Sequence, residues 1–295
     1  MASFFPSSQQ HLTRRNFLIA GAAGAAGVAL YSSEVERHWV ETTDLDIKLA
    51  GLPEAFDGIR IVQLSDIHFG EFTEQFFLRR VVEKVNQLRP DVVLLTGDFV
   101  TQGVPGEEYA TGEGWKCAAV LNGIACRERY AILGNHDVLV NPTGVTEALS
   151  QNAIRVLRNG CLPLERSGSR VWLAGLDDAL EGNPDIDAAI PERIRNQPNE
   201  PVILMCHAPD YVRRILAHPA GKSVSFMLSG HTHGGQVRIP FLRPLALPPM
   251  GRRYVEGHFQ LGNLQLYVNR GIGTVNLPIR FNCPPEITVF TLRRA

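Results

Sequence analysis

The sequence predicts an α/β fold in which a parallel sheet packs against a second, strand-rich sheet. From Ile59 onward, short apolar runs alternate with stretches whose apolar residues recur at helical spacing, which is typical of parallel βαβ units. Beyond residue 151 the apolar runs are mostly of strand length, which predicts a further sheet packed on the first. A chain of 295 residues with 44% hydrophobic content is long enough for one substantial core.

The first half of the chain contains three strand candidates, each followed by a helix candidate. The strands are expected at 59–64, 91–95 and 130–133, and the helices at 73–88, 113–121 and 146–151. In the second half nearly every candidate is a strand. These strands are expected at 171–174, 202–205, 225–228, 236–239, 264–268 and 286–292, with an edge strand near 46–49.

The first thirty residues have the pattern of an export signal. Arg14 and Arg15 precede Phe17–Leu30, which is uncharged and rich in Gly and Ala. This stretch is shorter than the ~20 apolar residues of a typical membrane span and suits the apolar region of a signal. The paired arginines match the twin-arginine pattern, which predicts the twin-arginine translocase as a partner and a location in the periplasm or at the outer face of the cytoplasmic membrane. An ordinary N-terminal helix is the less favoured alternative.

We therefore expect residues 1–44 to form a signal and lead-in segment and residues 45–295 to form one folded domain. Val28–Tyr31 offers only a poor cleavage site, so the sequence leaves open whether the signal is removed or tethers the protein to the membrane.

The composition argues against nucleic acid as a partner and against a cysteine-based metal site. The 29 basic residues are balanced by 30 acidic ones, whereas proteins that bind duplexes usually carry an excess of Lys and Arg. None of the five cysteines lies in a C-x-x-C pair, as a zinc ribbon or redox motif requires. Cys117 and Cys126 could form a disulfide in an oxidising compartment, but buried free thiols are the favoured interpretation.

Five of the predicted strands end in residue types that bind metals. Any one of these clusters alone would be a common turn or a structural histidine. Strand ends in an open α/β sheet converge on one place, however, so their joint occurrence predicts a single site. The clusters are Asp66-Ile67-His68, Gly97-Asp98, Gly134-Asn135-His136-Asp137, Cys206-His207 and Gly230-His231-Thr232-His233.

These residue types suit two divalent ions. Carboxylate oxygen and imidazole nitrogen bind ions such as Mn, Zn or Fe, and a bridging carboxylate can hold two ions ~3.5–4 Å apart. Mixed Asp, Asn and His ligands leave open positions for water and substrate, unlike an all-Cys structural site. The clusters therefore predict a hydrolytic site rather than a structural one.

In this order the clusters resemble the motif series of the calcineurin-like metallophosphoesterase family, D-x-H, G-D, G-N-H-E/D, H and G-H-x-H. The resemblance covers roughly residues 45–295, which it identifies as a catalytic domain. It implies a four-layer αββα fold, a two-sheet β-sandwich flanked by helices, and a phosphate-ester substrate. The segment from Tyr267 to Ile287 is similar to the exported bacterial branch of the family.

The resemblance also implies a role for each site residue. His136 would act as general acid or stabilise the leaving oxygen, and Asp137, where many relatives have Glu, would orient it by accepting a hydrogen bond. A hydroxide held between the metals would attack phosphorus while the Asn135 region stabilises the phosphoryl charge. The implied ligands are Asp66, His68 and His233 for one metal, Asn135, His207 and His231 for the second, and Asp98 as the bridge.

Three further features are open to two interpretations. The arginines at 238, 243, 252, 253 and 280 could clamp an anionic group of the substrate, but solvated surface charge is favoured for most of them, and Arg280 is the best candidate of the five. The Pro-rich apolar segment 239–250 either rims the site, where it could touch a lipid chain or a membrane, or packs over the core. Asp177-Asp178 is interpreted as a turn, not as a ligand pair.

The leading hypothesis is thus an exported, metal-dependent phosphoesterase that favours phosphodiester, pyrophosphate or lipid-linked substrates. An exported broad phosphomonoesterase is the first alternative. The second is a metal-stabilised cell-envelope binding protein with little activity, which the intact ligand series disfavours.

Overall fold

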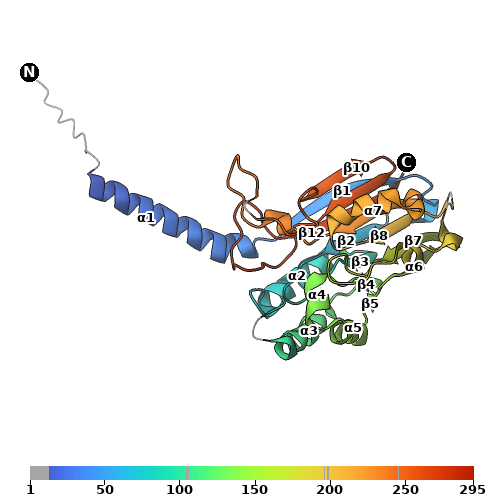
Figure 1. The fold of residues 1–295 in the computed structure, drawn as a ribbon, viewed down its shortest axis with the longest axis horizontal. Helices are drawn as coiled ribbons and strands as arrows, with labels where there is room; N and C mark the ends of the chain where they lie inside the picture. Colours follow the sequence, from blue (N-terminus) through green and yellow to red (C-terminus); the bar gives the residue numbers. More distant parts are fainter. Residues whose placement is uncertain (1–12, 104–105, 196, 198, 245) are drawn as a thin grey trace, which may run out of the picture.

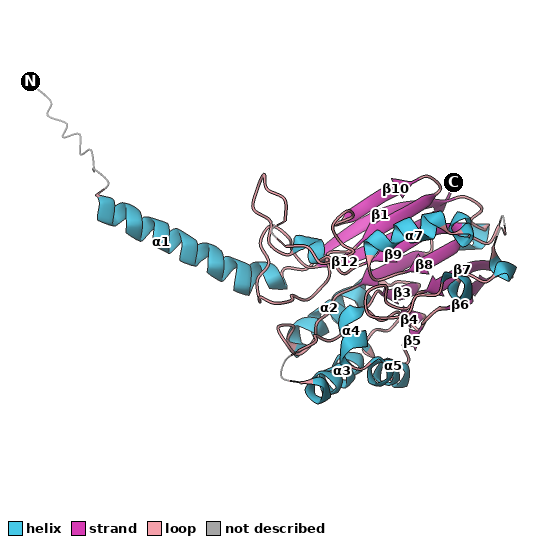
Figure 2. Ribbon diagram, viewed as in Figure 1, coloured by secondary structure: helices cyan, strands magenta, loops and turns pink. Residues whose placement is uncertain are grey.

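The structure is a computed structural model that describes residues 13–295, apart from 104–105, 196, 198 and 245. Two six-stranded sheets pack face to face and helices cover their outer faces (Figures 1 and 2). This arrangement confirms the predicted αββα fold. Residues 1–12 of the expected signal and Leu245 of the Pro-rich segment lie outside the described residues.

The first sheet is mixed, with its parallel part formed by the first half of the chain. Strands β2 to β5 run parallel, β12 is antiparallel to β2, and β1 forms a parallel edge beside β12. In spatial order the strands are β1 (Glu41–Leu49), β12 (Glu286–Arg294), β2 (Arg60–Leu64), β3 (Val92–Leu95), β4 (Arg129–Ala131) and β5 (Arg155–Val156).

The second sheet has a parallel centre and antiparallel edges. Strands β7, β8, β9 and β11 are parallel, while β6 and β10 are antiparallel to their neighbours. In spatial order the strands are β10 (Gly257–Leu261), β11 (Leu264–Val268), β9 (Val224–Ser229), β8 (Val202–Met205), β7 (Ser169–Gly175) and β6 (Gly160–Arg166).

Three apolar layers hold the four structural layers together. The middle layer joins the two sheets, where the rings of Phe226 and Phe290 meet edge to face with centroids 5.1 Å apart. The outer layers lie under the helices α2 (Gln75–Leu88), α3 (Glu107–Leu121), α4 (Asn135–Val140) and α5 (Pro142–Gln151) on the first sheet, and α6 (Ile186–Ala189) and α7 (Val212–Ala217) on the second. Short turns complete the chain at η3 (Glu54–Phe56), η4 (Glu192–Ile194), η5 (Pro209–Tyr211), η6 (Pro219–Ser223) and η7 (His233–Gly235).

The N-terminal helix α1 (Arg14–Leu30) projects away from this body and none of its residues is buried (Figure 1). It continues without a break through η1 (Tyr31–Val35) and η2 (Glu36–His38), which are docked on the body. Ser32 and Glu36 are buried there; the Ser32 carbonyl accepts from Arg280 N at 3.0 Å, and Glu36 Oε1 accepts from Cys283 N at 2.6 Å.

Several elements differ from the sequence-based expectation. The helices expected at 113–121 and 146–151 begin earlier, at Glu107 and Pro142. The edge strand β1 already begins at Glu41, so the expected domain boundary between 44 and 45 falls inside a strand. The strand expected at 236–239 is wrong: only one bridge forms there, between Val237 and Phe281. Gln236 has a φ of 53°, a left-handed conformation that a strand cannot contain.

Candidate metal centre

Half of the predicted site lies at the carboxyl ends of three neighbouring strands of the first sheet. Asp66 and His68 follow β2, Asp98 follows β3, and Asn135 begins α4 shortly after β4. Asp66, His68 and Asp98 are completely or almost completely buried. Parallel strands bring these side chains to one edge of the sheet, as their positions in the sequence predict.

The second sheet delivers the other half. His207 follows β8, and His231 and His233 follow β9, which is the neighbour of β8. His233 Nε2 lies 3.0 Å from His68 Nε2 and 3.5 Å from Asp66 Oδ1, so one cluster is shared between the two sheets.

Asp98 lies between two groups of ligand types. Its Oδ2 is 3.1 Å from His207 Nε2 and 3.6 Å from His68 Nε2. The potential ligand atoms within each group lie within 4.8 Å of one another. This is the position that a bridging carboxylate needs, because it faces both groups at once. The groups are Asp66, His68 and His233 on one side and Asp98, His207 and His231 on the other, and a third set, His68, Asp98 and His136, meets the same distance limit.

Hydrogen bonds on the outer ring nitrogens orient three of the histidines. His207 Nδ1 lies 2.6 Å from Thr96 O, and His68 Nδ1 lies 3.0 Å from Thr101 Oγ1. His231 uses Nε2 instead, 2.8 Å from Pro249 O. Each bond occupies one ring nitrogen and leaves the other for the centre of the site, which is how proteins orient metal-binding histidines.

The donor set fits divalent metal ions. Asn135 Oδ1 is buried but has no hydrogen-bond partner among the described residues. A buried polar atom without a partner is costly, and a cation beside it would supply the missing interaction. The donors are carboxylate, amide oxygen and imidazole, the set that Mn, Zn and Fe accept.

Electrostatics keep His68, His231 and Asp98 in the forms that bind cations. Burial, helped by the charge of His136, lowers the pKa of His68 to about 3, and burial with His207 lowers the pKa of His231 to about 4. Both imidazoles are therefore neutral at neutral pH. Burial acts to raise the pKa of Asp98, but His207 and His136 outweigh it and hold that pKa well below its usual range. His231 and His68 thus present neutral imidazoles beside an ionised carboxylate. Burial acts to lower the pKa of His207, but Asp98 outweighs it and raises that pKa well above its usual range, so a metal ion at His207 would have to displace a proton.

The backbone is strained at the same place. Non-glycine residues with positive φ are uncommon, and their concentration here indicates a loop geometry fixed by function. Close approach also requires glycine: a Cβ on Gly134 would lie 2.2 Å from Asp98 Oδ1, and one on Gly230 would lie 1.9 Å from Ser65 Oγ. The ligand candidates with positive φ are Asp66, His68, Asp98, His231 and His233.

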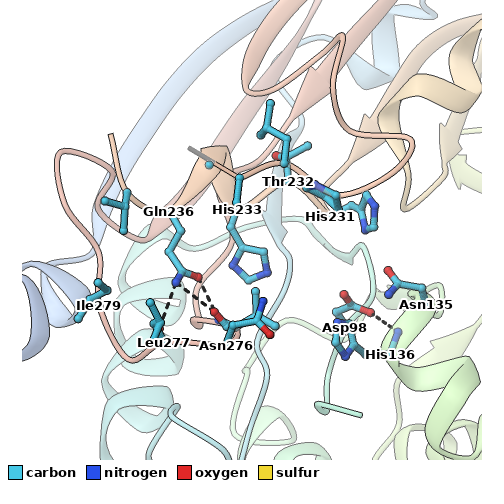
Figure 3. Close-up of a pocket in the computed structure, with 16 residues that line it drawn as sticks. Asp98, Asn135, His136, His231, Thr232, His233, Gln236, Asn276, Leu277 and Ile279 are labelled. Carbon is cyan, nitrogen blue, oxygen red and sulfur yellow. Dashed lines mark hydrogen bonds between the residues drawn. The ribbon is translucent and has the colours of Figure 1, made fainter. Parts of the chain in front are cut away.

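The site opens into a cavity of about 570 Å³ with two contrasting walls (Figure 3). The polar wall consists of Asp98, Asn135, His136, His231 and His233. The opposite, apolar wall comes from two loops after the last metal motif. Its residues are Val237, Ala246, Leu247, Pro248, Val275, Leu277 and Ile279.

A family model described as calcineurin-like phosphoesterase matches residues 59–235, which include every ligand candidate. The chain belongs to the calcineurin-like phosphoesterase family. It is therefore a metal-dependent hydrolase of phosphate esters, and the phosphoesterase motifs predicted from the sequence are those that meet at the cavity.

Relatives of nearly equal length support this assignment. The phosphoesterase is 36% identical to the uncharacterized metallophosphoesterase YkuE of Bacillus subtilis, over 96% of this chain and 98% of that protein. It is 28% identical to the phosphodiesterase YaeI of Escherichia coli, over 95% of this chain and 99% of that protein. It is 26% identical to the UDP-2,3-diacylglucosamine pyrophosphatase LpxG of Chlamydia muridarum, over 88% of this chain and 91% of that protein.

A solved structure shows the same fold. The sulfate thiohydrolase SoxB of Thermus thermophilus superposes with a TM-score of 0.51 at 13% identity, over 82% of the phosphoesterase and 57% of SoxB.

Asp137 has a different role from the predicted one. Its carboxylate does not bond to the His136 ring; it accepts the backbone N–H groups of Asp98, Phe99, Val100 and Gly134. Asp137 therefore positions the loop that carries the bridging Asp98. The His136 ring is oriented by Gln102, whose backbone N–H donates to Nδ1 at 3.0 Å.

The predicted substrate contact of Arg280 is wrong. Its side chain is fully buried, and its guanidinium donates to the backbone carbonyls of Gly273, Cys283, Arg270 and Gly271. A guanidinium with its donors committed to carbonyls holds the C-terminal loop together and does not reach the cavity.

The other predicted features follow the favoured interpretations in part: Arg238 is partly buried rather than solvated, and Cys126 and Cys161 are partly exposed. Arg238 pairs with Glu256 instead of facing the cavity. Asp178 accepts from Leu180 N and Glu181 N, so the Asp177-Asp178 pair forms the expected turn. All five cysteines are free.

Gln236 is the principal site residue that the sequence analysis missed. Its side-chain amide donates to the carbonyls of Val275 and Leu277, and its Oε1 accepts from Val275 N at 2.9 Å (Figure 3). Gln236 thereby attaches the apolar wall to the last metal motif. Its only sequence signal is its position just after Gly234-Gly235, which is too weak to reveal a contact 39 residues away.

Proposed function

We propose that the chain hydrolyses phosphodiester or pyrophosphate bonds in amphiphilic, lipid-linked substrates outside the cytoplasm. The observation that carries this proposal is the contrast between the two cavity walls. A phosphate group would lie against the wall that holds Asp98 and His231, and an apolar group of the same substrate would lie against Leu247, Leu277 and Ile279.

The charge of the cavity favours diesters over monoesters. None of the described residues that line it is Arg or Lys. A phosphomonoester dianion would gain from an extra cation, whereas the single charge of a diester is matched by the metal centre alone. The preference for diesters therefore rests on this lining and on the apolar wall, because Arg280 and Arg238 are committed elsewhere.

Two relatives are consistent with this substrate class. By their names, YaeI is a phosphodiesterase and LpxG acts on the pyrophosphate of a diacylated sugar nucleotide. Both align over most of the chain, so they support assigning the same broad class of reaction, hydrolysis of a phosphodiester or pyrophosphate bond, to this protein.

We assign the metal ligands from the groups of His and Asp side chains and, for Asn135, from its buried Oδ1 that has no hydrogen-bond partner in the described part of the chain. Asp66, His68 and His233 would hold one ion, Asn135, His207 and His231 would hold the second, and Asp98 would lie between them. Two such ions neutralise phosphate charge and lower the pKa of water. Asn135 directs its amide into the cavity, where it can also donate to a phosphoryl oxygen.

His136 is placed to protonate the leaving oxygen. Because Gln102 N–H donates to its Nδ1, this nitrogen must be unprotonated, so the neutral ring carries its proton on Nε2. The ring lines the cavity and packs edge to face on His68, with centroids 4.8 Å apart. A fixed tautomer with a donor facing the substrate is what general acid catalysis requires.

We further propose export by the twin-arginine route and retention at the outer face of the membrane. The described helix from Arg14 to His38 has 25 residues and is apolar enough to cross a membrane, although a removable signal would meet the same criteria. Arg14 and Arg15 at its start favour a cytoplasmic N-terminus and an external body.

Full-length protein, stripped of metal and reloaded with Mn, Zn or Fe, tests the proposed substrate class. We expect bis-p-nitrophenyl phosphate to be hydrolysed with a higher kcat/KM than p-nitrophenyl phosphate, and long-chain alkyl diesters with a higher value still. A clear preference for the monoester would instead indicate a broad phosphomonoesterase. Metal binding without turnover of any of these esters would indicate an envelope binding protein.

A further inference from the structure

We propose that the tip of segment 239–250, formed by Phe241 and Leu242, inserts into the outer leaflet of the membrane that α1 spans, so that the cavity opens onto the lipid. This inference rests on the retention of α1 proposed above. It adds a second contact with the bilayer, from the catalytic body itself.

The tip is apolar and largely exposed. Phe241 is 107% exposed and Leu242 is 61% exposed, with the exposed Ile239 beside them. Phe241 is also held at a φ of 69°, an unfavourable conformation for an aromatic residue. A soluble chain that had nothing to contact here would gain by folding these side chains inward.

The base of the segment is fixed, so the tip is presented in a defined place. Gly235 approaches Pro244 so closely that a Cβ on Gly235 would lie 2.4 Å from Pro244 Cβ. At the other end, Pro249 O lies 2.8 Å from His231 Nε2, and Met250 O accepts from Asp210 N at 2.9 Å. The tip is therefore attached rigidly to the metal centre.

The end of α1 lies on the same side of the body as this loop (Figure 1). Its direction is set by the docked turn after it, where Arg37 donates to Phe72 O at 2.8 Å and pairs with Glu74. Tyr31 and Trp39, which flank this turn, are 44% and 63% exposed. Exposed aromatic residues just beyond an apolar helix are typical of the membrane–water interface.

The apolar part of α1 is somewhat shorter than a bilayer. At ~1.5 Å per residue, Phe17–Leu30 extends about 21 Å against the ~30 Å hydrocarbon core, a mismatch that thinning of the bilayer and extension of flanking side chains accommodate. Arg14 and Arg15 can reach the far head groups with their long side chains. With α1 across the membrane, a loop at the level of its C-terminal end meets the outer leaflet.

A lipid surface explains the tip better than a protein partner does. Two apolar residues followed by the exposed Arg243 form a shallow insertion motif with a cation at the level of anionic head groups. The same segment continues into Leu247 and Pro248 of the apolar wall, and the exposed Leu277 lies across the cavity. An acyl chain could thus pass from the leaflet to the cavity without crossing water.

Depth-dependent quenching tests this contact in the full-length protein, reconstituted in phosphatidylethanolamine–phosphatidylglycerol vesicles. Phe241→Trp places a reporter at the tip, and Leu216→Trp places one on α7, where the native side chain is 45% exposed. Brominated acyl chains should quench the added emission of Phe241→Trp about twofold, because insertion reaches ~5–10 Å into the interface. They should leave the added emission of Leu216→Trp unchanged. The three native tryptophans, including Trp39, are common to both variants, so their emission is subtracted by using the unsubstituted protein.

The outcomes separate the possibilities. Co-sedimentation with vesicles together with equal quenching in the two variants would show that α1 anchors the protein while the tip stays in water, which overturns the inference. Failure to co-sediment would overturn both the anchor and the inference. Hydrolysis of bis-p-nitrophenyl phosphate by the same sample reports the phosphoesterase function separately. Phe241→Asp should leave that hydrolysis unchanged and lower the hydrolysis of a bilayer-embedded alkyl diester about tenfold.

Discussion

The polar and apolar walls of the cavity differ in how the chain holds them. The polar wall follows strands of both sheets. Most of its ligand candidates are buried, three of its histidines are hydrogen-bonded on one ring nitrogen, and five of the candidates have positive φ. The apolar wall comes from two long loops. Gln236 connects one of them to the last motif, and Pro249 O on His231 Nε2 connects the other. Leu277 in that wall is 56% exposed.

This difference indicates that the polar wall carries out the reaction and that the apolar wall selects the substrate. Strand ends place metal ligands with little freedom, so the reaction is fixed by the fold. The loops contact the rest of the substrate, and they can change without moving the ligands. Substitutions in the first wall should therefore affect all substrates equally, and substitutions in the second should depend on the substrate.

The largest effect is expected for Asp98→Ala. Loss of the carboxylate that faces both ligand groups should release at least one ion and remove several kcal/mol of transition-state stabilisation, about 10⁴-fold in kcat/KM for bis-p-nitrophenyl phosphate. Metal analysis by mass spectrometry and steady-state kinetics provide the measurement. Asp44→Ala, at an exposed position of β1, is the matched control. Full activity in Asp98→Ala would contradict the assigned centre.

His136→Ala should be less severe. The variant should keep its metals, because His136 is placed as a proton donor and not as a ligand, while kcat falls about 10²–10³-fold. His258→Ala, on β10, serves as the control. If turnover is unchanged with the metals in place, the leaving oxygen does not need His136.

Asp137→Asn should act mainly on stability. An amide nitrogen would face backbone N–H groups that now donate to a carboxylate, at a cost of about 3 kcal/mol in the free energy of unfolding. Urea denaturation of the metal-free protein measures this cost. Asp46→Asn, at an exposed ion pair with Arg293, should change it by less than ~0.5 kcal/mol. Equal stability of the two variants would contradict the positioning role.

The smallest effect is expected in the apolar wall. Leu277→Ser should leave the hydrolysis of bis-p-nitrophenyl phosphate nearly unchanged and reduce kcat/KM for a long-chain alkyl diester about tenfold, since a partly buried Leu contributes on the order of 1.5 kcal/mol. Leu216→Ser is the control with comparable exposure. Equal losses on both substrates would show that the wall supports the metal centre and does not select the substrate.

The contrast between the walls also explains which features the sequence could predict. Asp66, Asp98 and His231 were predicted because their residue types coincide with strand ends, which converge in any sheet of this kind. The role of Asp137 was missed because it depends on how the loop after β3 folds back towards α4. Arg280 was misassigned because its pattern in the tail resembles that of an exposed arginine, and only the packed structure shows its burial.

The strand expected at 236–239 failed for a related reason. Alternation over four residues is a weak pattern, and the left-handed conformation of Gln236 overrides it. The extent of β1 was underestimated because an edge strand with charged residues such as Asp44 and Asp46 gives little apolar signal.

The pairing of β1 with β12 has a consequence for the order of assembly. Glu41 lies opposite Glu286, and the turn at Ser32–Glu36 docks on the Arg280–Cys283 segment. The N-terminal part of the body, which leaves the ribosome early, therefore makes these contacts only once the segment from Arg280 to Glu286 has also emerged. The orientation of the N-terminal helix is thus settled only after residues 280–294 have been synthesised. A truncated or stalled chain would present this helix without its fixed joint, and any machinery that recognises the helix together with its base could distinguish finished from unfinished molecules.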